Sequence, residues 1–102
     1  MENIFKISLF KKVEEFILTL NPQEQAKISS SLSALGNKKF DAIYVKQLRG
    51  EIKELRVKKY RLIFFIYQNT VFVSGIFYKQ SNKTPKKEIE MAEKYYKIIT
   101  NQ

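Results

Sequence analysis

The chain has 102 residues, enough for one domain with one hydrophobic core. It contains neither cysteine nor histidine, which excludes disulfides, thiolate metal sites and the commonest general base, so we expect no metal and no cofactor. A net charge of +9, from 19 basic and 10 acidic residues, indicates a polyanionic partner such as nucleic acid. A merely soluble basic surface, or one that meets an acidic protein, would have the same composition.

The hydrophobic content of 44% predicts a folded globular protein, and we expect a single domain over residues 1–102 because no repeat, linker or low-complexity tract is present. No apolar run reaches the roughly 18 residues that a membrane span needs. The first residues do not have the pattern of a signal peptide. We therefore expect a cytoplasmic protein.

Two helices are predicted in the first third of the chain, after a short edge strand over residues 4–9. Apolar residues at helical spacing predict an amphipathic helix over residues 10–20. In the "NPQE" that follows, Asn21 is a candidate N-cap, Pro22 suits the first helical position and Glu24 has the spacing of a capping box. This second helix runs to about Leu35, and Gly36 is a suitable stop. Its apolar face consists of Ile28, Leu32 and Leu35. So short a link predicts an antiparallel helical hairpin.

The rest of the chain favours strands and then one helix. Residues 37–51 are predicted to be irregular, with a helical turn over residues 43–48. Alternating or continuous apolar runs predict strands over residues 52–57, 60–67 and 71–79. Gly75 predicts a bulge or a close approach of another backbone. Thr84 is the expected cap of the last helix, with Pro85 at its first position, and the inner face of that helix is Ile89, Ala92, Tyr96 and Ile99.

Short connections between the strands predict an antiparallel sheet and therefore an α+β fold. The predicted architecture is a small antiparallel sheet with an N-terminal helical hairpin and a C-terminal helix. If the helices cover one face of this sheet, the opposite face or an edge is left open.

Most of the basic residues lie in two short segments, because 11 of the 19 fall within residues 46–61 and 79–87. In an antiparallel sheet the end of one strand lies beside the start of the next, so Arg56, Arg61 and Lys79 should gather at one end of the sheet, with Lys83 just beyond. Such a cluster is unfavourable by Coulomb repulsion unless an anion joins it. Phosphate is the obvious anion, since guanidinium groups bind its oxygens bidentately.

Further residues are candidates for contact with a nucleic acid. The basic ones are Arg49, Lys53, Lys58 and Lys59, and two tyrosines, Tyr60 and Tyr78, lie close enough to the cations to stack on a base. The alternative is that the lysines are only solvated surface residues. Glu51, Glu54 and Glu88 could also pair with several of the cations.

Two stretches, "YVKQLRGEIKELRVKKYRLIFF" and "GIFYKQSNKTPKKEIEMAEKYYKI", resemble the phage-derived HigB branch of the RelE-like toxins. The resemblance covers residues 44–98 and is carried by an "ELR" strand, a "YR" strand start and the "KTPKKEIE" entry to the last helix. It implies a RelE-like fold and a type II toxin–antitoxin toxin, an mRNA interferase that generally cuts mRNA in the ribosomal A site. The functional residues that it implies are Arg56, Arg61, Lys79 and Lys83. Many relatives carry a second lysine where this chain has Gln80.

The implied partners are mRNA, the ribosome and a cognate helix-turn-helix antitoxin of the HigA-like kind, in a complex that we expect to be a hetero-tetramer. For metal-independent cleavage by the RNA 2′-hydroxyl we assign Arg56 and Arg61 to the phosphate. Lys79 and Lys83 are candidates for proton transfer or further charge stabilisation, and Glu54 is an outside candidate for the base.

Two rival hypotheses remain. One is a non-catalytic RNA- or ribosome-binding module, and the other is a protein whose basic groove accepts an acidic or amphipathic peptide.

Overall fold

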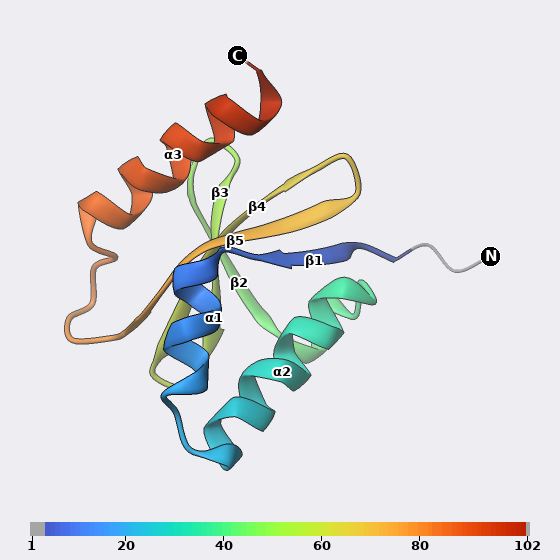
Figure 1. Cartoon of the computed structure of the whole chain (residues 1–102), viewed down its shortest axis with the longest axis vertical. Helices are drawn as coiled ribbons and strands as arrows, with labels where there is room; N and C mark the ends of the chain where they lie inside the picture. The colour runs from blue at the N-terminus through green and yellow to red at the C-terminus, as the bar shows by residue number, and fades with distance from the viewer. Residues whose placement is uncertain (1–3, 102) are drawn as a thin grey trace.

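A computed structural model describes residues 4–101 of the chain (Figure 1). The elements, in chain order, are β1 (Lys6–Leu9), α1 (Lys11–Leu18), α2 (Pro22–Gly36), a short 3₁₀ helix (Phe40–Ala42), β2 (Tyr44–Arg49), β3 (Ile52–Val57), β4 (Tyr60–Tyr67), β5 (Thr70–Tyr78) and α3 (Lys86–Thr100). Among these described residues no helix is both long enough and apolar enough to cross a membrane.

The strands form one five-stranded sheet in the order β1-β5-β4-β3-β2. The α+β class and the three central strands are confirmed, with β3 and β4 beginning and ending at the predicted residues. Two predictions need correction. The edge strand β1 pairs parallel to β5, so the sheet is mixed. Residues 44–49, predicted to be irregular, form strand β2, because pairing with β3 supplies hydrogen bonds that the local sequence pattern does not announce.

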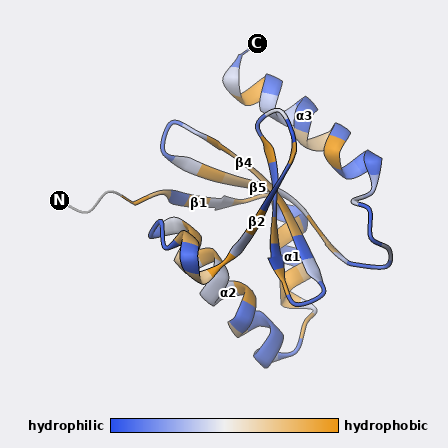
Figure 2. Ribbon diagram, turned by 180° about the vertical axis from the view of Figure 1, so that it is seen from behind, coloured by the Kyte–Doolittle hydropathy of each residue, from blue (hydrophilic) through white to orange (hydrophobic). Residues whose placement is uncertain are grey.

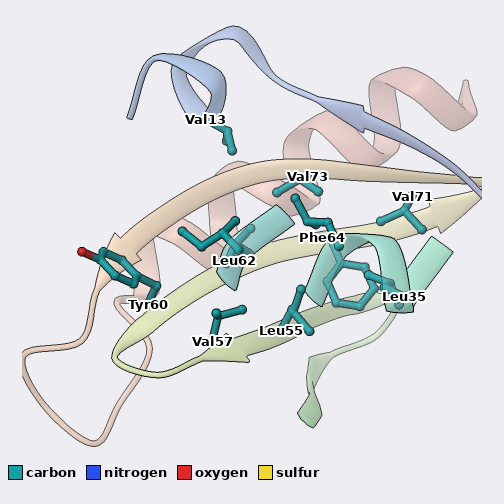
Figure 3. Close-up of a cluster of buried hydrophobic side chains, with 11 residues drawn as sticks. Val13, Leu35, Leu55, Val57, Tyr60, Leu62, Phe64, Val71 and Val73 are labelled. Carbon is teal, nitrogen blue, oxygen red and sulfur yellow. The ribbon is translucent and has the colours of Figure 1, made fainter. Parts of the chain in front are cut away.

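Helices cover both faces of the sheet, so of the two openings that we expected, an open face is wrong, whereas the edge strand β2 is mostly exposed. Figure 1 shows α1 and α2 on one side and α3 on the other. The core on the side of α1 and α2 contains Val13, Ile28, Leu32, Leu35, Leu55, Val57, Tyr60, Leu62, Phe64, Val71 and Val73, most of which are labelled in Figure 3. A second, smaller core under α3 contains Ile52, Ile63, Phe65 and Ala92, with Tyr96 and Ile99 packed against it. Successive side chains of each central strand point to opposite faces of the sheet and so pack in two different cores. This is why "YRLIFFIY" is apolar on both faces.

The predicted helix starts are correct at α2 and wrong in detail at α3. Asn21 caps α2, since its Oδ1 accepts the backbone N–H of Glu24 at 2.9 Å, and Pro22 occupies the first helical position. The Glu24 side chain does not complete a capping box, because it accepts the hydroxyl of Tyr60. Thr84 does not cap α3 either: the residue at the cap position is Pro85, and the Thr84 side chain bonds elsewhere.

Gly75 fulfils its predicted role at an irregularity. The β4–β5 register shifts between Ile63 and Phe64, so that these two residues pair with Gly75 and Val73 and leave Ser74 as the extra residue of a bulge. A Cβ added at Gly75 would lie 2.5 Å from Oε1 of Glu88. The glycine therefore makes room for the first turn of α3 to approach the sheet. The close approach is made by a side chain and not by another backbone.

Candidate functional site

Four side chains form a row across the sheet on the face that also carries α3. The register pairs Tyr44 of β2 with Arg56 of β3, Arg56 with Arg61 of β4, and Arg61 with Phe77 of β5. Two arginines thus stand directly opposite each other on neighbouring strands, an arrangement of like charges that destabilises a sheet. An aromatic residue lies at each end of the pair.

A cleft opens over Arg56, Arg61 and Phe77 of this row, between the end of the sheet and the loop that leads into α3, and Tyr44 lies outside its lining. Its lining consists of Glu54, Arg56, Arg61, Phe77, Lys79, Ser81, Asn82, Lys83 and Thr84. The cleft has a volume of only ≈ 10 Å³, about the room of one water molecule. It cannot enclose a small molecule. A ligand would have to lie across its mouth, as an extended chain does. Figure 2 shows the β5–α3 loop as mostly hydrophilic.

The structure brings together the four residues that the sequence predicts to be catalytic. Arg56, Arg61, Lys79 and Lys83 all line the cleft, although Lys83 is 22 residues beyond Arg61 in the chain. Lys79 is fixed by the hairpin, since its backbone N–H bonds to the carbonyl of Lys59 at 2.7 Å. Lys83 is carried by the loop, where the Ser81 hydroxyl bonds to both its carbonyl and its amide. Four cations and one carboxylate therefore share this cleft.

Glu54 is the carboxylate, and it is only 2% exposed. Its Oε2 accepts Nε–H of Arg56 at 3.1 Å, and its Oε1 accepts the Thr84 hydroxyl at 2.6 Å. One buried acid therefore holds an arginine of β3 and the end of the β5–α3 loop in fixed positions. Because both oxygens are engaged and screened from solvent, Glu54 suits a positioning role better than that of a general base.

Arg61 is anchored at one corner of its guanidinium group. Nη1 donates to the carbonyl of Lys58 at 2.7 Å and to that of Tyr60 at 3.0 Å, and the residue is 8% exposed. These bonds hold the planar group against the β3–β4 turn. A guanidinium group has five N–H donors, so the anchored group still has donors to offer to an anion.

The other basic candidates divide into two groups. Lys58 and Lys59 form the β3–β4 turn and line a second hollow beside Arg61 and Lys79, so they extend the cationic surface outward. Arg49 lies away from the cleft, where Nη2 pairs with Glu93 of α3 at 2.9 Å. Lys53 precedes Glu54 on β3, and because successive residues of a strand point to opposite faces, Lys53 lies on the face away from the cleft. The structure does not bring these last two to the phosphate site.

The two tyrosines expected to stack on a base lie on the wrong face of the sheet. Tyr60 is buried at 7% exposure in the core beneath α1 and α2, as Figure 3 shows, and its hydroxyl donates to Glu24 at 2.6 Å. That hydrogen bond raises the pKa of Tyr60 to about 12, and burial of the side chain is the second largest cause. Tyr78 packs edge-on against Tyr60, with ring centroids 5.4 Å apart. We therefore do not retain Tyr60 as a stacking residue.

Sequence reasoning missed two residues near the cationic surface. Tyr44 is 58% exposed and its ring centroid lies 4.7 Å from Cζ of Arg56. Lys27 of α2 lines a hollow together with Lys58, and the pKa of Lys27 is lowered because the Lys58 ammonium group lies within hydrogen-bonding reach. Tyr44 could have been found from the sequence only by recognising β2 and its register, and Lys27 only from the tertiary fold.

A family model matches residues 15–97, which include every residue of the cleft. The chain belongs to the family of phage-derived Gp49-like proteins (DUF891). No curated protein is similar enough in sequence to count as a match.

Solved structures of RelE proteins share the fold of this Gp49-like protein. The archaeal RelE–RelB complex from Pyrococcus horikoshii OT3 matches with a TM-score of 0.60 and 14% identity, over 74% of this chain and 96% of that one. The toxin–antitoxin complex RelBE2 from Mycobacterium tuberculosis gives 0.60 and 17%, over 74% and 99%. A mutant of the E. coli toxin RelE in the free state gives 0.60 and 17%, over 90% and 97%. The RelE-like fold is therefore confirmed.

The first prediction concerns Glu54. We expect Glu54→Ala to lower the free energy of unfolding by about 1–3 kcal/mol, because it removes two hydrogen bonds from a buried carboxylate and leaves Arg56 facing Arg61 without compensation. Urea unfolding measures this. The matched control is Glu90→Ala, whose carboxylate forms an exposed pair with Lys86 at 3.8 Å and should contribute less than about 0.5 kcal/mol. Equal effects of the two substitutions would show that Glu54 does not hold the site together.

Proposed function

We propose that this Gp49-like protein is the toxin of a type II toxin–antitoxin system and that it cleaves mRNA. The observation that carries the proposal is the pair of directly opposed arginines, Arg56 and Arg61, in a cleft that also contains Lys79 and Lys83. The sheet holds these charges together at a cost that a phosphodiester would offset. The RelE-like fold and the resemblance of residues 44–98 to the HigB branch support the same function.

The proposed reaction uses the RNA as its own nucleophile. The 2′-oxygen attacks the adjacent phosphorus and forms a new P–O bond, the bond from phosphorus to the 5′-oxygen breaks, and a 2′,3′-cyclic phosphate and a 5′-hydroxyl result. A proton leaves the 2′-hydroxyl and another joins the departing 5′-oxygen. Arg56 and Arg61 would stabilise the additional negative charge on the phosphoryl oxygens. We assign the proton transfers to Lys79 and Lys83, which line the cleft beside the arginines.

The narrow cleft favours a dependence on the ribosome. The cleft has room for about one water molecule, and the hollow that adjoins it at Arg61 and Lys79 is an open surface, so the substrate backbone would be contacted from one side and little of it would be surrounded. Alignment of the 2′-oxygen with the scissile bond would then have to come from elsewhere. We propose that the ribosomal A site supplies that alignment and that the chain is a poor nuclease on free RNA.

A non-catalytic RNA- or ribosome-binding module is the alternative function. It is favoured by one observation: among the described residues that line the cleft, Glu54 is the one carboxylate, and both of its oxygens are engaged, so proton transfer there would rest on the lysines. In this case the cations would hold phosphates without breaking any bond, and mRNA would stay intact.

The partner that we propose is a HigA-like helix-turn-helix antitoxin, which would form a hetero-tetramer with the toxin in the cytoplasm. The archaeal and mycobacterial structures described above were each solved as a complex of toxin and antitoxin. An antitoxin that covers the cleft must offer acidic side chains to its four cations. The bias of the whole chain, 19 basic against 10 acidic residues, would assist such an encounter.

Expression of the chain without an antitoxin should arrest growth and translation, because mRNA would be cut. The measurement is inducible expression with mapping of mRNA 5′ ends before and after induction. New 5′ ends within coding regions support the toxin. Normal growth with soluble protein and intact mRNA would contradict it, and arrested growth with intact mRNA would favour the binding module.

Arg61→Ala should abolish toxicity while the fold persists. Loss of a charge-assisted contact to the transition state costs about 3 kcal/mol, which is a hundredfold or more in rate. A second variant, Arg61→Lys, keeps the charge but loses the planar fork and should recover only part of the rate. The control is Lys11→Ala, on α1 at the opposite face of the sheet. Undiminished toxicity of Arg61→Ala, with circular dichroism like that of the wild type, would exclude the proposed role.

Association with the antitoxin should slow steeply as salt rises, while dissociation changes much less. The reason is that steering between opposite charges is screened over a Debye length of about 8 Å at physiological ionic strength. Stopped-flow mixing across a salt series measures both rates. An association rate that stays flat with salt would place the antitoxin on a face other than the cationic one.

A further inference from the structure

We propose that Tyr44 is the stacking platform for the nucleobase that adjoins the phosphate held by Arg56 and Arg61. The inference deepens the proposed function and rests on it, since it assigns a base-binding subsite beside the phosphate site. The occupant is a single-stranded RNA. Tyr44 lies within the family match and at the start of the resembling stretch, but the functional residues that the resemblance implies do not include it.

The exposure of Tyr44 is the first observation. Tyr44 is 58% exposed and lies at the end of the cross-strand row, on the edge strand β2. α3 packs mainly on β3, β4 and β5, and it meets β2 at the end away from Tyr44, where Arg49 pairs with Glu93. A tyrosine in this position buries little area. Its contact with Arg56 is a cation–π pair, which at an exposed site is worth only about 0.5–1 kcal/mol. Stability alone therefore gives little reason for an aromatic ring here.

The contact between Tyr44 and Arg56 is the second observation. The guanidinium group lies over one face of the ring, with Cζ 4.7 Å from the ring centroid, and its Nε is held by Glu54. The ring is thereby oriented by a group that is itself fixed. Arg56 is 29% exposed in its side chain, so it can still meet an anion at the cleft mouth. One arginine then joins the phosphate site to the aromatic ring.

The spacing of the row suits one nucleotide. Neighbouring strands lie about 4.8 Å apart, so Tyr44 is one strand from Arg56 and two strands from Arg61. If a phosphate bridges the two arginines, the sugar and base attached to it lie next to the pair, on one side or the other. On the β2 side the adjacent residue is Tyr44. On the β5 side the adjacent groups are Phe77 and the loop that carries Lys79 and Lys83.

Other aromatic residues do not offer this site. Tyr78 is exposed by 47% but faces away from the cleft and packs on Tyr60. Phe40 is exposed by 53% but lies in the 3₁₀ helix before β2, outside the cross-strand row that contains Arg56 and Arg61. Stacking needs only the face of a base, so the subsite should accept every base, with a preference for purines because their larger rings stack more strongly.

Fluorescence anisotropy with uncleavable probes tests the proposal. The probes are labelled pentaribonucleotides with every 2′-hydroxyl methylated: one of adenine, one of uracil, and one abasic chain that offers only sugar and phosphate. Stacking on alanine-scanned aromatic residues is worth about 1–3 kcal/mol per base. The wild-type chain should therefore bind the adenine probe roughly tenfold more tightly than the abasic probe, with the uracil probe between them.

In Tyr44→Ala the difference between the adenine and abasic probes should fall below about twofold, while the affinity for the abasic probe stays unchanged. Tyr44→Phe should retain the difference. The matched control, Tyr78→Ala, removes an exposed tyrosine from the other face and should also retain it. Arg61→Ala should weaken binding of all three probes alike, which separates the phosphate site from the base site.

Several outcomes would overturn the subsite. One is an adenine preference that persists in Tyr44→Ala, and another is equal weakening of adenine and abasic probes in that variant. A third is a wild-type chain that binds none of the probes. If Tyr44→Ala instead lowers only the affinity for the antitoxin, the ring binds a protein side chain and not a base. In each of these cases the proposed function survives if mRNA is still cut in cells.

Discussion

The cross-strand pair of Arg56 and Arg61 is the constraint on which the site depends. Hydrogen bonding in β3 and β4 fixes the two residues opposite each other, so backbone pairing holds two like charges together. The sheet tolerates this because Glu54, one pleat away on the same face of β3, places a buried carboxylate on Nε of Arg56. Compensation is partial, since Lys79 and Lys83 also line the cleft. A phosphodiester bound there would relieve the remaining repulsion, and rigid placement is what charge stabilisation in a transition state requires.

The rest of the fold serves to keep this pair at an open end of a covered sheet. Two cores, one beneath α1 and α2 and one beneath α3, make the central strands stiff. The β5–α3 loop returns over the arginines and is tied down where the Thr84 hydroxyl meets Glu54 at 2.6 Å. The same carboxylate thus positions an arginine and the loop that carries Lys83. Glu54 is in this sense the residue through which the sheet and the loop act as one site.

Local patterns in the sequence were sufficient for strands β1, β3, β4 and β5, for the three α-helices and for the cationic end of the sheet. Three features depended on tertiary contacts that no local pattern encodes. Strand β2 forms because β3 lies beside it. Most of its residues are exposed, so the local sequence does not have the pattern that predicts a strand. Thr84 is a residue type that often caps helices, but its hydroxyl donates instead to the buried carboxylate of Glu54, 30 residues earlier in the chain. Tyr60 stands next to the cations in the chain, but alternation along β4 turns its ring into the opposite core.

The chemistry of the cut ends tests the central claim most directly, because 2′-oxygen attack in a cationic cleft leaves a distinctive product. Purified chain should be added to ribosomes programmed with one mRNA, and the termini of both fragments identified by mass spectrometry. The account predicts a 2′,3′-cyclic phosphate on the upstream fragment, a 5′-hydroxyl on the downstream fragment, and no cleavage when the scissile nucleotide lacks its 2′-hydroxyl. A 5′-phosphate, or cleavage that persists at a 2′-deoxy position, would contradict it.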